Sequence, residues 1–312
     1  METENQNTTI TSFVLWGFSN NLPVNLFFFF MFLFIYLLTL LANIVIMIVT
    51  NFLSSPMYFF LAHLAFLDIC FSSVTVPKLL EIFTKQQAIS YSACFVQMFF
   101  ILLTGSNEIC ILTAMAYDRY AAICKPLHYV QIMNKACCRW LMGAAWVVAF
   151  SYASINTFPA LKLGFCQANF IRDFSCEFPS LIALSCTDTF FNWTLLLITC
   201  GTIAISSLII ILFSYIHIIS TILKLNSTEA KRKTFSTCSA HLIVLTLYYF
   251  TGLFRYMRPN SASSIIVDEI FSVQYSLSTP MLNPLIYSLK NKEVKDTIKK
   301  LMGYKSLIFR TV

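Results

Sequence analysis

Charged residues are scarce in this chain: Asp, Glu, Lys and Arg make up 11% of its 312 residues, whereas hydrophobic residues make up 58%. A soluble domain carries about 25% charged residues, so this chain has too little polar surface to cover a globule in water. The mean hydropathy of +0.73 agrees. We therefore expect an integral membrane protein. The net charge of +7 does not indicate nucleic-acid binding, because the basic residues form no single patch.

Several other signatures are missing. No basic segment precedes the first apolar run, which begins with four phenylalanines at 27–30, and no small-residue cleavage site follows it, so we expect a retained helix rather than a signal peptide. There is no HExxH motif and no nucleophile with a base or metal ligands at membrane depth, which an intramembrane hydrolase needs. The chain also lacks the internal repeat with interrupted helices that is typical of secondary transporters. An enzyme, a metal centre and a cofactor are therefore not expected.

Seven apolar stretches are long enough to cross a bilayer; their approximate ranges are 26–49, 57–80, 95–118, 140–161, 193–222, 236–257 and 266–289. Backbone groups in lipid must hydrogen-bond within their own segment, so each stretch is expected to be a helix. The alternation of barrel strands over about ten residues is absent. The predicted fold is an all-α membrane protein with a seven-transmembrane helix bundle at 26–289, after an extracellular leader at 1–25 and before a cytosolic helix and tail at 290–312.

The orientation follows from the basic residues. With the N-terminus outside, 15 lysines and arginines lie on the cytosolic side and six lie outside or in the spans, as the positive-inside rule requires. The sequon at Asn7 fits a translocated, glycosylated N-terminus. Residues 291–302 read NKEVKDTIKKLM, which is typical of a short amphipathic helix on the lipids of the inner leaflet. A frayed polar tail is the alternative.

Polar residues interrupt the apolar spans. Asp68 in the second span and Glu108 in the third are costly in lipid unless they face the bundle interior, pair or stay protonated. They are a candidate cation site, or alternatively a static polar contact between helices. Asp118 and Arg119, where the third span meets water, indicate either a switch at the membrane face or an anchor for the helix end.

Four cysteines are expected on the extracellular side, where disulfides persist: Cys94, Cys166, Cys176 and Cys186. Four cysteines allow three pairings, and their spacing does not choose among them.

Five motifs in order carry a resemblance to a known family. They are SPMYFFL at 55–61, MAYDRYAAICKPLHY at 115–129, SY at 214–215, KTFSTCSAH at 233–241 and PMLNPLIYSLKN at 280–291. With them, the chain resembles the vertebrate odorant receptors, a branch of the rhodopsin-like G-protein-coupled receptors, over nearly its whole length.

The resemblance implies a receptor in the plasma membrane that binds a small volatile odorant and couples to a heterotrimeric stimulatory G protein of the olfactory type, which raises cyclic AMP. It implies disulfides from Cys94 to Cys176 and from Cys166 to Cys186. The residues implied in activation are Asp118, Arg119, Tyr120, Tyr215, His241, Asn283, Pro284 and Tyr287.

The resemblance also places a ligand pocket in the outer third of the bundle. The residues implied to line it are Ile101, Leu102, Gly105, Ser106, Thr199, Cys200, Ile203, Tyr249, Gly252, Leu253, Tyr256, Val273 and Ser276. Such a lining is apolar with a few hydroxyl and thiol groups, which suits a small volatile with one hydrogen-bonding group.

The chain departs from the family pattern at two larger residues. Phe250 replaces a glycine and is expected to fill space below or beside the pocket. Arg255 replaces an apolar residue and is expected either to extend to the outer surface or to pair with an acid such as Glu269 or Glu177. We favour the extracellular pair over contact with the ligand; in the alternative, the ligand carries an acid. The alternative function is a rhodopsin-like receptor for another small-molecule or peptide ligand, expressed outside the nose. An amine receptor usually has an aspartate where this chain has Ile101.

Overall fold

A computed structural model describes residues 11–15, 21–84, 86–166, 169–257, 277, 279–287 and 291–308. Side chains are not described at 230, 233, 236–237, 253–257, 292 and 302–308. Of the predicted spans, the seventh is described only at 277 and 279–287, which are helical.

Five of the described helices are long and apolar enough to cross a bilayer. They are α1 (Leu22–Thr50), α2 (Pro56–Phe83), α3 (Tyr91–Cys124), α5 (Lys135–Ala160) and α7 (Phe190–Lys224). The sixth predicted span lies in α8 (Thr228–Met257), whose apolar part is Cys238–Gly252. Each helix covers its predicted stretch and extends beyond it, except that α5 ends one residue before the predicted end at 161. The extensions include apolar residues such as Phe190 and Phe191 as well as polar ones.

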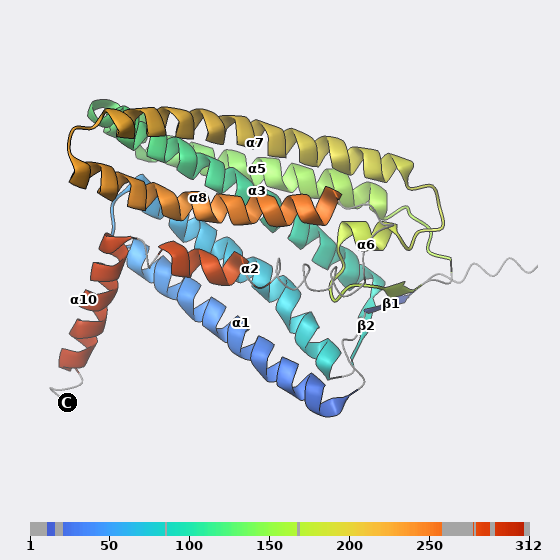
Figure 1. The fold of residues 1–312 in the computed structure, drawn as a ribbon. Coiled ribbons are helices and arrows are strands. Elements are labelled where there is room, and N and C mark those ends of the chain that lie inside the picture. Colours follow the sequence, from blue (N-terminus) through green and yellow to red (C-terminus); the bar gives the residue numbers. More distant parts are fainter. Residues whose placement is uncertain are drawn as a thin grey trace, which may run out of the picture.

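The helices form one bundle around α3 (Figure 1). Helix α3 is the most buried of the long apolar helices and packs against α2, α5, α7 and α8. Helix α1 packs on α2 and leaves large side chains such as Phe27, Phe30 and Phe34 more than 60% exposed. In water such exposure would be costly, whereas in a bilayer these side chains are solvated by acyl chains. The described helices are thus packed with their core on α3, and the exposed apolar surface of α1 suits contact with lipid.

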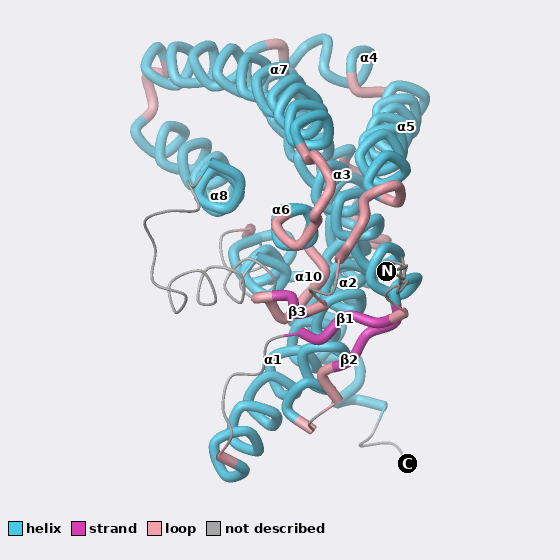
Figure 2. Tube along the Cα trace, turned by 90° about the vertical axis from the view of Figure 1, so that its right-hand side faces the viewer, coloured by secondary structure: helices cyan, strands magenta, loops and turns pink. Residues whose placement is uncertain are grey.

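A small sheet closes one end of the bundle. Strand β1 (Ser12–Leu15) pairs antiparallel with β2 (Ala88–Ser90) and parallel with β3 (Phe170–Ile171), in the order β2-β1-β3. The short helix α6 (Phe178–Ile182) lies at the same end, which faces the viewer in Figure 2. Phe13 and Leu15 of β1 are fully buried. The leader therefore contributes to the core, which its polar composition did not indicate.

The opposite end of the bundle carries the short elements that follow α3, namely η1 (Pro126–His128) and α4 (Tyr129–Ile132), and also α10 (Lys292–Ile308) (Figure 1). Val294 of α10 is fully buried, and Ile298 and Leu301 pack against the same core cluster. The segment predicted at 291–302 is thus helical from Lys292, and the helix continues to Ile308.

Candidate functional site

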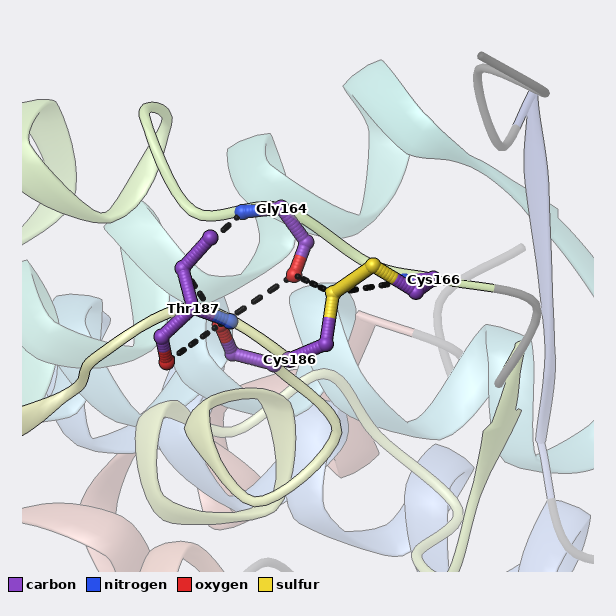
Figure 3. Close-up of a disulfide and its surroundings, with 5 residues drawn as sticks. Gly164, Cys166, Cys186 and Thr187 are labelled. Atoms are coloured by element: carbon purple, nitrogen blue, oxygen red, sulfur yellow. Dashed lines mark hydrogen bonds between the residues drawn. A yellow bond between two sulfur atoms is a disulfide. The ribbon is translucent and has the colours of Figure 1, made fainter. Parts of the chain in front are cut away.

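Two disulfides hold the loop before α7, and they are the pairs that the resemblance implies. Cys94 on the first turn of α3 is bonded to Cys176, and Cys166 is bonded to Cys186 (Figure 3). The second pair is supported by the backbone N–H of Cys186, which donates to Gly164 O at 3.0 Å. Gln97 of α3 accepts from Cys176 N at 2.9 Å and donates to Val74 O of α2 at 2.9 Å. The loop is therefore fixed to α3, and Gln97 in turn is bonded to α2.

A cavity of about 410 Å³ lies between α3, α5, α7 and α8. Its described lining is Ile101, Leu102, Gly105, Ser106, Ile109, Tyr152, Leu196, Leu197, Cys200, Gly201, Ile203, Ala204, Ile205, Tyr248, Tyr249 and Gly252. None of these residues carries a formal charge. A volume of this size and an apolar lining with a few polar groups are typical of sites for small organic molecules.

Eight of the residues implied for the pocket line this cavity: Ile101, Leu102, Gly105, Ser106, Cys200, Ile203, Tyr249 and Gly252. The side chains of Leu253 and Tyr256, and the whole of Val273 and Ser276, lie outside the described residues. Thr199 is not in the lining. Its hydroxyl instead lies 3.1 Å from Asn156 Nδ2 of α5, which donates to it.

Two expectations about the surroundings of the pocket have different outcomes. Phe250 is 59% exposed and is not in the cavity lining, so the expectation that it fills space at the pocket is wrong. The preceding residue, Tyr249, lines the cavity, and adjacent residues on a helix point about 100° apart. Arg255 lies outside the described side chains. Its suggested partner Glu177 is buried, with Ser175 Oγ donating to Glu177 Oε1 at 3.3 Å.

The polar groups of the cavity are already hydrogen-bonded. Ser106 Oγ donates to Leu102 O at 2.7 Å, and Tyr248 Oη donates to Gly105 O at 2.6 Å. Tyr249 Oη lies 2.6 Å from Ser207 Oγ of α7. Neither Tyr248 nor Tyr152 was foreseen. The two adjacent tyrosines at 248–249 were a usable sequence signal for Tyr248. Tyr152 carried no such signal, because it is one of many aromatic residues on α5 and α7.

A second, much smaller cleft surrounds Arg119. Its described lining is Met57, Met115, Arg119, Ala240, His241, Tyr287 and Asn291. Its volume is about 10 Å³, which is the space of roughly one water molecule. Among the described residues, this cleft leaves no room for a protein segment beside Arg119.

Arg119 is held by the acid that precedes it. Its Nη2 lies 3.3 Å from Asp118 Oδ2 and also contacts Met57 Sδ of α2. Asp118 is fully buried, and its other oxygen accepts from the hydroxyl of Tyr129 at 2.7 Å. Burial and the Asp118 carboxylate raise the pKa of Tyr129, so its phenol stays protonated and donates. A buried carboxylate is costly without such partners. Tyr120 points elsewhere, toward Phe213 and His217 of α7.

Tyr215 and His241 connect α7, α8 and α3. Tyr215 Oη lies 2.7 Å from His241 Nδ1, and His241 Nε2 lies 3.1 Å from Leu112 O. A carbonyl only accepts, so Nε2 must carry a proton, and a neutral ring then accepts from Tyr215 at Nδ1. This chain of hydrogen bonds links three helices beside Arg119. Tyr287 is buried in the same cleft, and its hydroxyl has no hydrogen-bond partner within the described part of the chain.

Asn283 joins the two acids of the spans. Its Nδ2 donates to Asp68 Oδ1 at 3.0 Å and to Glu108 Oε1 at 3.1 Å. Asp68 is buried and Glu108 is partly buried. Pro284 follows in the same helical segment, 279–287. Across the described residues, no group of three or more His, Cys, Asp or Glu side chains is placed to hold a metal ion.

Comparison with known proteins identifies the family. The model of a family described as "Olfactory receptor" matches residues 32–305. The human protein named Olfactory receptor 8S1 is 47% identical over 294 residues, which cover 92% of this chain and 81% of that protein. Human Olfactory receptor 8H3 is 42% identical over 95% of this chain and 96% of its own length, and mouse Olfactory receptor 4E2 is 43% identical over 94% and 96%. The chain belongs to the olfactory receptor family of multi-pass membrane proteins, which are receptors and not enzymes.

Proposed function

We propose that this receptor binds small, mostly apolar volatile molecules in the cavity between α3, α5, α7 and α8, and that binding activates an olfactory-type stimulatory G protein and so raises cyclic AMP. The cavity is the observation that carries the ligand class: about 410 Å³, with no charged residue in its described lining. A site of that kind selects ligands by shape and apolar area.

The proposed orientation places the N-terminus outside the plasma membrane and the C-terminus in the cytosol. Fifteen basic residues on the proposed cytosolic side against six elsewhere support it. The two disulfides at the sheet end also support it, because the outer side is oxidising. In this orientation the cavity lies toward the outside and the cleft at Arg119 lies toward the cytosol, where the G protein is.

The proposed mechanism is a shift between two arrangements of the helices. Tyr248 and Tyr249 of α8 line the cavity, and His241, two helical turns earlier on α8, hydrogen-bonds Tyr215 beside Arg119. A ligand that binds better when α8 is displaced favours a state in which the cleft is open. It shifts the equilibrium only by its difference in affinity for the two states.

The test is cyclic AMP in cells that express the receptor at their surface with an olfactory-type G protein, exposed to a chemically diverse panel of volatiles. We expect a dose-dependent signal from some members. Arg119→Ala should lose it, and Arg139→Ala, at an exposed arginine on α5, should keep it. Equal signals from wild type and Arg119→Ala at equal surface levels would contradict the role of Arg119. A surface-expressed receptor that answers to no volatile would contradict the ligand class.

A further inference from the structure

We propose that ligands enter and leave the cavity sideways from the bilayer, through an opening between α7 and α8, and not through the extracellular end of the bundle. This opening, the lateral mouth, is bounded by Leu197, Gly201 and Ile205 of α7 and by Gly252 of α8. The inference rests on the proposed function and concerns the route to its site. Its basis is that described residues close the sheet end of the bundle, whereas the cavity lining continues onto the surface of α7.

The sheet end of the bundle is closed by tightly packed aromatic residues. Phe13 of β1 is fully buried, and its ring centroid lies 5.9 Å from that of Tyr91 and 5.2 Å from that of Phe165. The disulfide between Cys94 and Cys176 fixes the loop over the start of α3. A ligand arriving at this end therefore meets a sheet, a cross-linked loop and a buried aromatic cluster.

The short helix α6 adds a second layer at the same end (Figure 2). Its side chains Phe178 and Leu181 are buried in the same apolar cluster as Leu102 and Leu196, which line the cavity. The loop thus extends the core of the bundle over the outer side of the cavity. Entry from this side requires α6 to be displaced from that core.

On α7 the lining continues from the interior to the surface. Leu197, Gly201 and Ile205 all line the cavity and are four residues apart, so they form one stripe along the helix. Leu197 and Ile205 are each more than half exposed. Thr199, which points roughly the opposite way on the helix, is hydrogen-bonded to Asn156 of α5. The cavity therefore reaches the surface on the flank of α7 that faces away from α5.

Helix α8 forms the other side of the lateral mouth. The lining there includes Gly252, which has no side chain to close the opening. Tyr249 Oη lies 2.6 Å from Ser207 Oγ, and this hydrogen bond joins the two helices at the inner end of the stripe. The lateral mouth lies within the apolar stretch 193–222, where the neighbouring phase is the acyl chains of the bilayer.

The bilayer is also the richer source of apolar ligand. Each methylene group raises the concentration of a molecule in the bilayer, relative to water, about fourfold. Entry from lipid therefore makes the association rate constant, expressed per aqueous concentration, increase with chain length. For entry from water, added methylene groups act mainly on the dissociation rate constant.

The first experiment measures this rate constant on the full-length receptor in cells. The probes are straight-chain homologues of the most potent volatile in the panel, and the readout is the onset and decay of G-protein recruitment, recorded by resonance energy transfer. We expect the association rate constant to increase about fourfold for each added methylene group. A rate constant that does not depend on chain length contradicts entry from the bilayer.

The second experiment changes the width of the lateral mouth. Ile205→Trp should slow the onset and the decay of the signal by the same factor, and Leu197→Ala should speed both. The half-maximal concentration should stay the same in each variant, because the route of entry changes rates and not the equilibrium. Ile198→Trp is the matched control, since Ile198 is equally exposed on α7 and is not in the described lining; both rates should remain those of the wild type.

A third variant tests the opposite route. Phe13→Ala loosens the sheet end and should leave both rates unchanged. If Phe13→Ala speeds onset and decay while Ile205→Trp and Leu197→Ala alter neither, ligands enter from the extracellular end and this inference is overturned, whereas the proposed function stands. If no volatile recruits the G protein at a surface-expressed receptor, the proposed function itself is overturned, and the inference with it.

Discussion

Among single residues, Tyr129 is placed to restrain the ion pair of Asp118 and Arg119. It lies on α4, just after η1, so a short element next to α3 reaches the buried carboxylate with a hydroxyl at 2.7 Å. Burial and Asp118 raise the pKa of this phenol. Tyr129 therefore keeps its proton at every pH below about 10, the ordinary pKa of a tyrosine, and loses it only at higher pH. The bond is therefore present throughout the physiological range.

Tyr129→Phe is expected to raise the basal cyclic AMP signal several-fold without ligand. Asp118 then loses the hydrogen bond from Tyr129, and the ion pair with Arg119 loses one of its supports. The loss of one hydrogen bond to a charged group is worth about 1.5–3 kcal/mol. The measurement compares basal signals at equal surface levels, with Tyr117→Phe, on the exposed face of α3, as the control. An unchanged basal signal in Tyr129→Phe would show that the hydroxyl is not part of the restraint.

At the scale of elements, two glycines on facing helices set the width of the cavity. Gly201 of α7 and Gly252 of α8 both line it, and a Cβ built at either position would meet no atom within 4 Å. A methyl group therefore fits at each position and takes its volume from the cavity rather than from a neighbouring side chain.

In the double variant Gly201→Ala, Gly252→Ala, the potency of the longest active ligands should fall, by about tenfold for each methylene of lost space. The potency of shorter ligands should stay the same. Replacing a helical glycine also stabilises the helix by about 0.5–1 kcal/mol. Gly143→Ala on α5 separates the two effects, because that site is equally open and lies outside the lining. A uniform change across ligand lengths would argue against the cavity as the ligand site.

The attachment of α10 depends on its first residues. Asn291 Oδ1 accepts from Glu293 N at 3.0 Å and Val294 N at 3.4 Å, which caps the helix. Its Nδ2 donates to Tyr58 Oη of α2 at 3.1 Å, and Tyr58 Oη donates to Glu293 Oε2 at 2.6 Å. The cap therefore fixes α10 to α2 as well as starting it.

Asn291→Ala is expected to weaken α10 by about 1 kcal/mol, because the two N–H groups and Tyr58 lose their partner. Amide hydrogen exchange of 293–301 in purified receptor measures this directly, and exchange there should become several times faster. Thr297→Val, which removes only a bond within α10 to Glu293 O at 2.8 Å, is the control. Protection equal to wild type in Asn291→Ala would mean that burial of Val294 alone holds the helix.

For the whole molecule, the orientation in the membrane can be tested at both ends of the chain. An epitope added after residue 312 should be accessible to antibody only after the cells are permeabilised. An epitope added before residue 1 should be accessible in intact cells. Asn7→Gln should abolish the shift in mobility that a glycosidase produces, whereas Asn226→Gln, in a sequon between α7 and α8 on the proposed cytosolic side, should not. Glycan on Asn226 would reverse the proposed topology.

Much of this architecture could be predicted from the sequence, because lipid imposes simple rules. A stretch of about 20 apolar residues has to be a helix, and the end motifs of α3 and of the segment 279–287 identify the family. Other features had no such signal. Strands of two to four residues carry no periodicity, and the strand in the leader, β1, is revealed only by the packing of Phe13 and Leu15. The sequence also does not show how α7 is rotated about its axis. In the structure Thr199 is hydrogen-bonded to Asn156, and its neighbours 200 and 201 line the cavity.

The wall of the cavity at α7 is only one side chain thick. Leu197 and Ile205 both line the cavity, yet they are 56% and 61% exposed on the surface of the bundle. Under the proposed function, these side chains would touch acyl chains on one side and the guest molecule on the other. The bilayer would then be a part of the proposed binding site, and we expect a change of lipid composition to alter odorant potency much as a substitution in the wall does.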